Sequence, residues 1–555
     1  MTKRVRAGAA AFVTVLCTAA AVAATTAPAG AASVSARTAT AGAGSVSGAT
    51  GSGFSGPGLL PGNLLVSESF YGNDPNIVAG QTQLPPGCVT GCVTATANGS
   101  YPQVFNNVLA DPSFGVTSRI FLAEMTPSGR PLGTLQVPSD ELVTSFSSKS
   151  ELALNLSPDG RTVSFMGYVA KPDTVDVSNA NTPGVIDPTN PVPGAYYRAA
   201  AQLSANGRIQ FTETNAYSGD NGRAAITAEA GGKDLIFTSG NAGNGSNPQP
   251  DGVILGAGAQ VLTPSGQPES AQDPGTPTPV GSFNVTQLGD KADKIGKDDN
   301  FRGLTIYNNV LYYTKGSGSN GVNTVYFIDT TGKACPDGTG LPAAGAQLPA
   351  SPLSYSTAAL QTTGLPSNMC ILKGFNTTLA KTSTNSFPFG LWFANADTLY
   401  VADEGNGTNT YSGGEYTAAA AQTAAGLQKW VFNGSEWQLA YTLQAGLNLG
   451  QPYTVRGYPA GDNAATGLPW APATDGLRNL TGRVNPNGTV TIWAVTSTVS
   501  GGGDQGADPN KLVEITDPLT AAAPASGEGF RTVRAAVFGE VLRGISFTPG
   551  TGSRP

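Results

Sequence analysis

The stretch at residues 390–401 reads GLWFANADTLYV: an apolar run, a tight turn of small and polar residues, and a second apolar run. Aromatic and β-branched runs joined by Asn and Asp are typical of two antiparallel strands in a hairpin. The same unit recurs at residues 152–166, 224–237, 303–313 and 479–493. A unit that recurs this often indicates a repeat architecture.

Further strand-like runs follow these hairpins, such as 427–431 and 437–441 after the first one quoted. Four antiparallel strands per unit form a blade of a β-propeller. The unit begins a sixth time at 543–547 with no strands after it, whereas the N-terminal region supplies three strands without an inner one, at 64–70, 120–124 and 132–137. The sequence therefore predicts an all-β fold: a six-bladed β-propeller closed by pairing of the C-terminal strand with the N-terminal blade, with seven blades as the alternative count.

Residues 399–406 read LYVADEGN, with the core Tyr400-Val401-Ala402-Asp403. This motif resembles the YVAD-x-GN signature of NHL-type and related six-bladed propellers, including the SMP-30-like calcium-dependent esterases. The resemblance implies the propeller fold. It transfers no catalytic residue, because paraoxonase-like members of that group use histidine, which this chain lacks.

The composition narrows the possible chemistry. Charged residues make up only 12% of the 555 residues, and the chain contains no histidine. This excludes Ser-His-Asp and Cys-His catalysis and every His-ligated metal site. A net charge of −7, without a Lys/Arg block after the N-terminal region, speaks against nucleic acid as a partner. What remains is carboxylate, Tyr, Lys or Arg chemistry, a carboxylate-bound calcium, or no chemistry at all.

The N-terminal region predicts export. Residues 1–32 carry three early cations, an apolar run and small residues at the end, which is typical of a cleaved signal peptide. Residues 33–62 are rich in Gly, Ala, Ser and Thr, as in a flexible linker, and residues 63–555 form the single propeller domain. We expect a secreted extracellular monomer without a membrane span.

Four cysteines follow the signal peptide. Their even number in an exported chain favours two local disulfides, Cys88 with Cys92 and Cys335 with Cys370. A metal site made of four thiols is the alternative, and the missing CxxC spacing and histidine disfavour it.

Loop lengths distinguish the two faces of the propeller. The turns between first and second strands, such as Asn308-Asn309, and those between third and fourth strands are short. Connections after second strands and between blades are long, as at 403–426 and 446–476. In an antiparallel blade both long classes emerge on one side, here called the long-loop face, and elaborated loops on a rigid scaffold are where ligands bind.

Several charged residues and one tyrosine are candidates for that face. Four inner strands are expected to begin with arginine at the channel mouth, and we expect this basic rim to bind an anionic or polyhydroxylated ligand: Arg223, Arg302, Arg478 and Arg543. The alternative is that these arginines pair with acidic neighbours and hold blades together: Asp220, Asp298, Asp299 and Asp475. The same face is predicted to carry Lys315, Tyr71, Asp74, Asp403 and Glu404, whereas Glu68 and Glu124 lie within strands and are candidates for the channel.

Two functions fit these candidates. The first is binding of a small molecule or glycan. The second is histidine-independent carbohydrate hydrolysis by a carboxylate pair, or lyase chemistry by Tyr or Lys with Arg. Asp403 is also a candidate calcium ligand. The alternative for Asp403 and the other candidate Asp residues is that their side chains cap turns.

Two other patterns have a functional and a structural interpretation. Residues 316–321 match GxGxxG, but they join two strands, so phosphate binding at a helix N-terminus is disfavoured. Tyr453, Tyr458 and Trp470 either stack on sugar rings or hold the 446–476 loop in place.

Overall fold

The computed structural model describes residues 58–70, 80–81, 83–84, 93–94, 117–145, 151–172, 174, 177–178, 180–184, 186, 194–241, 258–264, 300–318, 321–335, 337–350, 369–382, 385–458, 460–463, 466–501 and 508–552. The chain divides into two units, residues 1–50 and 51–555, and every described residue belongs to the second.

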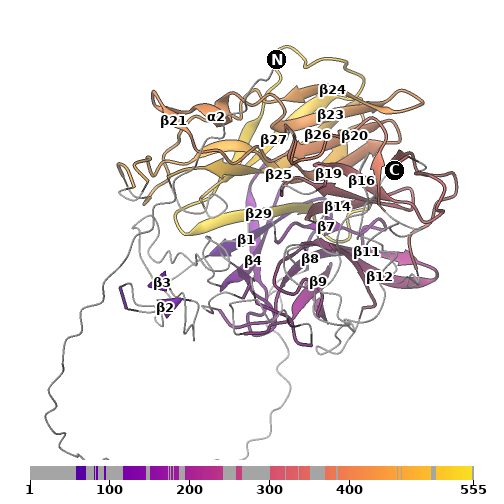
Figure 1. Cartoon of the computed structure of the whole chain (residues 1–555), viewed down its shortest axis with the longest axis horizontal. Coiled ribbons are helices and arrows are strands. Elements are labelled where there is room, and N and C mark those ends of the chain that lie inside the picture. Colours follow the sequence, from indigo (N-terminus) through magenta and orange to yellow (C-terminus); the bar gives the residue numbers. More distant parts are fainter. Residues whose placement is uncertain are drawn as a thin grey trace, which may run out of the picture. The chain divides into compact units, whose positions relative to one another are not determined.

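The described residues form six antiparallel blades of a β-propeller (Figure 1). Blade 1 consists of β29 (Glu540–Phe547), β1 (Leu64–Phe70), β4 (Thr117–Met125) and β5 (Pro131–Gln136). Blade 2 consists of β7 (Asn155–Leu156), β8 (Thr162–Tyr168), β9 (Arg198–Ser204) and β10 (Ile209–Thr214). Blade 3 consists of β11 (Gly222–Ala230), β12 (Lys233–Gly240) and β13 (Ala259–Leu262).

The second half of the ring has the same organisation. Blade 4 consists of β14 (Phe301–Tyr307), β15 (Val310–Lys315), β16 (Thr324–Ile328) and β18 (Met369–Leu372), with β17 (Thr339–Gly340) parallel to β18. Blade 5 consists of β19 (Pro388–Asn395), β20 (Thr398–Asp403), β23 (Gly426–Phe432) and β24 (Trp437–Leu443). Blade 6 consists of β25 (Ala473–Val484), β26 (Thr489–Val499), β27 (Lys511–Pro518) and β28 (Arg531–Ala535).

Minor elements lie outside this pattern. They are β2 (Gln83–Leu84), β3 (Val93–Thr94), β6 (Thr144–Ser145), β21 (Tyr411–Ser412), β22 (Glu415–Tyr416) and the short helix α2 (Thr417–Ala420). In the part of the chain that the structure describes, no helix is both long and apolar enough to pass through a bilayer.

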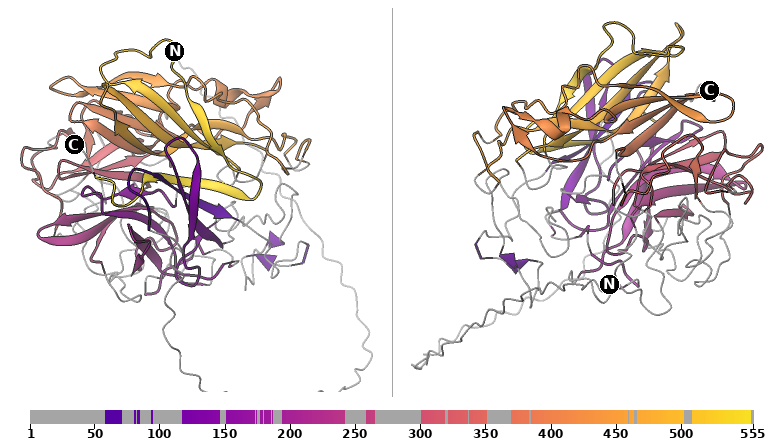
Figure 2. Two further views of the ribbon diagram at one scale, coloured as in Figure 1. Left: turned by 180° about the vertical axis from the view of Figure 1, so that it is seen from behind. Right: turned by 45° about the horizontal axis from the view of Figure 1, so that its top comes forward.

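The ring is closed by the end of the chain, as the sequence predicts. Strand β29 pairs antiparallel with β1, from Leu64 opposite Phe547 to Phe70 opposite Glu540. Figure 2 shows the yellow C-terminal strand beside the indigo N-terminal strand. Each inner strand also contacts the inner strands of both neighbouring blades, in the cyclic order β29, β7, β11, β14, β19 and β25.

The hydrophobic core lies between consecutive blades. One cluster joins blades 3, 4 and 5, and others join blades 5 and 6, 6 and 1, 1 and 2, and 2 and 3. Each blade thus buries both of its apolar faces against its neighbours, which is why a closed ring leaves no blade with an uncovered face.

The short turns follow from local backbone chemistry. Asn308 and Asn309, between β14 and β15, have φ of 48° and 60°, and Gly231 and Gly232, between β11 and β12, have φ of 58° and 75°. Positive φ at both central residues defines a type I′ turn, whose twist matches that of paired strands, and Asn and Gly tolerate it best.

Blade 2 departs from the prediction. A strand is expected over residues 152–156, but β7 contains only Asn155–Leu156. The cause is Leu152, whose φ of 66° turns the backbone out of the extended region. The Leu152 carbonyl instead accepts a hydrogen bond of 2.6 Å from Ser67 Oγ of blade 1.

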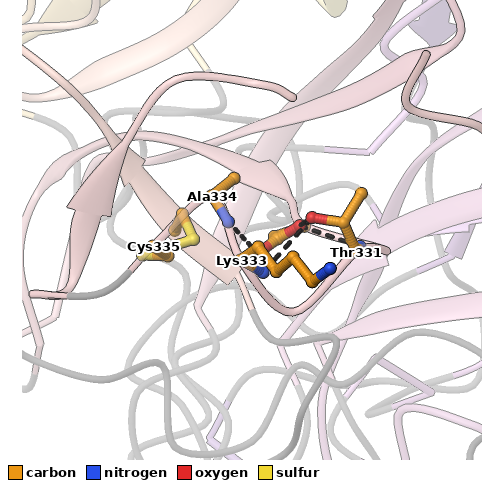
Figure 3. Close-up of a disulfide and its surroundings, with 6 residues drawn as sticks. Thr331, Lys333, Ala334 and Cys335 are labelled. Atoms are coloured by element: carbon orange, nitrogen blue, oxygen red, sulfur yellow. Dashed lines mark hydrogen bonds between the residues drawn. A yellow bond between two sulfur atoms is a disulfide. The ribbon is translucent and has the colours of Figure 1, made fainter. Parts of the chain in front are cut away.

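Cys335 and Cys370 form the predicted disulfide, with their Cα atoms 5.8 Å apart. It connects the segment after β16 to β18 in blade 4 (Figure 3). Beside it, the backbone N–H groups of Thr331 and Ala334 each donate to the Asp329 carboxylate over 2.8 Å. The other predicted pair, Cys88 and Cys92, lies outside the described residues.

Candidate functional site

The four predicted arginines lie in the inner strands β11, β14, β25 and β29, and between 3% and 8% of each residue is exposed. Only Arg223 and Arg302 stand near a strand start. Arg478 and Arg543 lie inside their strands, because β25 begins at Ala473 and β29 at Glu540.

Glycines allow the close strand packing around Arg478. A Cβ atom at Gly390 would lie 2.6 Å from the carbonyl oxygen of Arg478, and one at Gly303 would lie 2.2 Å from that of Phe389. The absence of a side chain at both positions lets neighbouring inner strands approach closely. The Arg478 guanidinium, 6.0 Å from the centre of the Phe389 ring, is therefore enclosed between two blades.

Glu404 is the acidic centre of this arginine cluster. It directly follows β20, and one of its carboxylate oxygens lies 3.2 Å from Nε of Arg478 while the other lies 3.6 Å from Nε of Arg302. The three residues come from blades 4, 5 and 6, so the carboxylate connects all three. Arg302 and Arg478 therefore hold blades together, which was the alternative interpretation of the sequence. Their partner is Glu404, which was not among the acidic partners expected.

A polar network extends the arginine cluster toward blade 3. Arg223 donates to the Asn300 side chain and, over 3.1 Å, to the carbonyl oxygen of Phe301. Asn300 and Arg302 both donate to Ser317 Oγ, while Lys315 Nζ donates to the Ser317 carbonyl oxygen over 2.9 Å. The residues of the GxGxxG match thereby accept hydrogen bonds from the basic cluster.

Asp403 and Asp475 place two more carboxyl groups beside Glu404. Asp403, the last residue of β20, accepts hydrogen bonds from the backbone N–H of Phe387 and Gly405 at 2.7 and 3.0 Å. Asp475 accepts from the Gly407 N–H at 2.8 Å and from Gln422 Nε2 at 2.6 Å. Both side chains are buried and hold loop backbone in place.

Burial changes the acid–base properties of this cluster. It raises the pKa of Asp403 to about 6 and that of Asp475 to about 7, and the neighbouring Glu404 charge adds to both increases. Burial also lowers the pKa of Arg302 to about 9, and the nearby charges of Arg223 and Arg478 lower it further. The guanidinium groups therefore repel one another in a poorly solvated place.

Arg543 and the two strand glutamates lie elsewhere in the ring. Arg543 donates over 3.3 Å to the carbonyl oxygen of Ser145 in blade 1. Glu68 pairs with Arg534 of β28, and Glu124 accepts hydrogen bonds from Leu60 N and Asn63 Nδ2. The predicted candidates Tyr71, Asp74, Asp298 and Asp299 lie outside the described residues.

The aromatic residues of the 446–476 loop anchor it. Trp470 is buried, the Tyr453 hydroxyl donates to the carbonyl oxygen of Pro509 over 2.8 Å, and the Tyr458 hydroxyl donates to Asp508. Lys511 Nζ also lies 3.7 Å from the centre of the Tyr453 ring. These contacts favour the structural interpretation of the loop aromatics.

A second buried cluster was not predicted from the sequence. The side chains of Lys429 and Asp517 are both 0% exposed, their charged atoms are 2.9 Å apart, and Tyr400 and Tyr441 donate to the same carboxylate. Burial, reinforced by the Asp517 carboxylate, raises the pKa of both phenols. The motif tyrosine, Tyr400, thus joins blade 5 to blade 6.

Among the described residues, no group of three or more Cys, Asp or Glu side chains is arranged to hold a metal ion. Asp403 directs its oxygens to backbone N–H groups, which are donors that compete with a cation for the same lone pairs.

No family model matches the chain, and no curated protein matches it. Solved structures show distant likeness. An ulvan lyase of polysaccharide lyase family PL25 is 13% identical and covers 86% of this chain and 95% of its own, with a TM-score of 0.30. CoXyl43, a GH43 β-xylosidase/α-arabinofuranosidase from a compost microbial metagenome, is 9% identical to this chain. The match covers 71% of this chain and 98% of CoXyl43, with a TM-score of 0.27. At these TM-scores the likenesses carry no argument about this chain.

Proposed function

We propose that this chain is an exported propeller that binds an anionic or polyhydroxylated ligand, such as an acidic glycan, on its long-loop face. The observation that carries the proposal is the pairing of Arg302 and Arg478 with the one carboxylate of Glu404, together with the charge of Arg223, which acts on Arg302. Burial raises the pKa of Asp475 to about 7, so this carboxyl group carries only part of its negative charge near pH 7.

An anion with several oxygens would relieve this charge imbalance. Guanidinium groups bind carboxylate and sulfate through paired N–H donors, and such charge-assisted bonds are stronger in a place that excludes water. We also propose that the protein is exported, which the signal-peptide pattern of residues 1–32 supports. The proposed relation to NHL-type and SMP-30-like propellers is supported by the motif at residues 399–406.

The test is a binding screen of the purified protein against uronic-acid and sulfated oligosaccharides, with neutral oligosaccharides of equal length in parallel. We expect acidic ligands to bind more tightly, with an affinity that falls as salt is added. Arg302→Gln and Arg478→Gln should each weaken binding about tenfold or more, as expected when a charge-assisted hydrogen bond is lost. Equal affinity of the wild type and both variants for every acidic ligand would refute the proposal.

A second candidate function is carbohydrate hydrolysis or lyase chemistry without histidine. The observation that favours it is Asp403, whose pKa of about 6 suits a general acid near neutral pH, next to the ionic Glu404. Turnover of the same oligosaccharides, measured with and without a chelator, separates catalysis from binding and also tests assistance by calcium. The enzymatic proposal requires that Asp403→Asn abolish turnover while ligand binding persists.

A further inference from the structure

A cavity of about 290 Å³ lies between blades 4 and 5, outside the arginine cluster. Its lining comes from the start of β16, from the connection between the two blades and from β20, β23 and β24. The volume stands just below the roughly 300–1,000 Å³ typical of ligand pockets. It therefore suits a single small ring and excludes a long polymer segment.

The cavity has a buried floor and an open rim. At the floor, Asn323 and Thr324 are each 2% exposed and Val401 is 0% exposed. At the rim, Leu439 is 46% exposed, and Thr378 is exposed as well. A small molecule can thus enter from solvent and lie against a floor that is shielded from water.

Two polar groups on the floor have no hydrogen-bond partner among the described residues. They are the amide nitrogen Nδ2 of Asn323 and the hydroxyl Oγ1 of Thr324. Lys315 Nζ donates to Asn323 Oδ1 over 3.1 Å, which fixes the orientation of the amide. Buried polar groups are nearly always paired in native proteins, so two adjacent exceptions in one cavity indicate a ligand that pairs with them.

The opposite part of the lining is aromatic. The rings of Phe375 and Trp430 are stacked, with centroids 3.9 Å apart and an interplanar angle of 21°. Leu439 is the cross-strand neighbour of Trp430 and extends this apolar wall toward the rim. Gln428 Oε1 accepts a hydrogen bond of 3.0 Å from Trp430 Nε1, which holds the indole ring in position.

The described residues that line the cavity include no Asp, Glu, Lys or Arg. A charged ligand would therefore be desolvated without compensation, whereas a neutral one would not. A pyranose ring combines apolar C–H faces, which stack on aromatic side chains, with hydroxyl groups that accept and donate hydrogen bonds. We propose that this cavity binds one ring of a neutral sugar, held by Trp430, Asn323 and Thr324.

This second site does not depend on the proposed arginine site, although the two are neighbours. Ser386 and Gln428, both in the cavity lining, donate to Asp403 at 3.1 and 3.3 Å, and Asp403 precedes Glu404. The two sites differ in charge. The site around Glu404 contains arginines, whereas the described lining of the cavity contains no charged residue. A glycan that contains both acidic and neutral sugars could occupy both.

The test measures binding of glucose, galactose, mannose and xylose to the full chain by saturation-transfer NMR and calorimetry. We expect at least one of them to bind with a millimolar dissociation constant. Thr324→Val should weaken that binding about tenfold without lowering the melting temperature, because the lost hydroxyl has no hydrogen-bond partner among the described residues. Trp430→Ala should abolish it.

Thr134→Val is the matched control, since Thr134 is an exposed residue of β5 in blade 1, and it should leave sugar binding unchanged. The proposal is overturned if no sugar in the panel binds, or if Thr324→Val and Trp430→Ala both bind like the wild type. Loss of neutral-sugar binding in Arg302→Gln alone would also overturn it and would assign that binding to the arginine cluster. Acidic oligosaccharides that bind normally to Thr324→Val would leave the function proposed above intact.

Discussion

Glu404 is the residue on which three blades depend, because Arg302 and Arg478 share its carboxylate in a place with little access to water. We predict that Glu404→Gln lowers the free energy of unfolding by about 3–5 kcal/mol, the range for a buried ion pair that loses one partner. Urea denaturation followed by circular dichroism measures this. Glu141→Gln, at an exposed turn, should change stability by less than about 0.5 kcal/mol. Equal stability of both variants would show that Glu404 contributes no net ion-pair energy.

Asp475 is predicted to make the protein less stable as pH rises. Its folded-state pKa of about 7 lies above the ordinary value of 3.8, so the folded state binds the proton more tightly than the unfolded state. The stabilising contribution is complete below pH 3.8 and is lost as pH rises toward 7. Asp403, with a pKa of about 6, acts in the same direction. The free energy of unfolding, measured between pH 4 and 8, should therefore decrease.

Asp475→Asn should flatten that profile, because the amide does not titrate, although its single oxygen can accept only one of the two hydrogen bonds that Gly407 N–H and Gln422 Nε2 donate to the carboxylate. Asp140→Asn, at an exposed position, is the control that should keep the wild-type profile. A wild-type slope in Asp475→Asn would assign the pH dependence to other carboxyl groups.

At the scale of strands and loops, the sequence predicted those features that depend on local chemistry. Asn308-Asn309 and the apolar runs on either side define a hairpin without reference to the rest of the chain. The predicted strand over 152–156 is confirmed only at Asn155–Leu156, because the backbone of Leu152 has a positive φ and its carbonyl group is bonded to Ser67 of blade 1.

The candidate site was predictable only in part. The sequence named the arginines and Glu404 as candidates, but only Arg223 and Arg302 stand near a strand start, and Arg478 and Arg543 lie inside their strands. It did not reveal that Glu404 pairs with Arg478, which is 74 residues away, or that Lys429 pairs with Asp517 across a blade boundary. Such pairs depend on how neighbouring blades are rotated against each other, and no local pattern encodes this.

The Cys335–Cys370 disulfide stabilises blade 4 by closing a loop between residues 35 positions apart. Loop-closure entropy predicts that Cys335→Ala/Cys370→Ala lowers the free energy of unfolding by about 3–4 kcal/mol. Chemical denaturation of the oxidised protein and of the double variant measures the difference. Free thiols at both positions in the denatured, unreduced wild type would contradict the pairing.

For the whole molecule, the decisive contact is between β29 and β1. We predict that a chain lacking residues 540–555 no longer unfolds in one cooperative transition and associates through the uncovered edge of β1. Thermal melting by near-ultraviolet circular dichroism and size-exclusion chromatography measure the two effects. A truncated chain that stays monomeric and melts like the wild type would show that the ring does not need its last strand.

Gly544 allows a milder test of the same contact. A Cβ atom there would lie 2.1 Å from the carbonyl oxygen of Leu152 and 2.7 Å from the nitrogen of Leu154, both backbone atoms of blade 2. We predict that Gly544→Ala lowers the free energy of unfolding by about 1–3 kcal/mol, which is the usual cost of adding atoms to a closely packed interior. Gly552→Ala, where nothing lies within 4 Å of the added atom, is the matched control. Equal melting temperatures of the two variants would contradict this prediction.

Closure by the tail also dictates the order of events during synthesis. Of the described strands, ribosomes release β1 first and β29 last, so the edge of β1 toward β29 stays unpaired until β29 emerges. An unpaired strand edge favours pairing between neighbouring nascent chains on one messenger. Codon changes that slow the final stretch should therefore reduce the yield of soluble protein more than equal delays placed earlier.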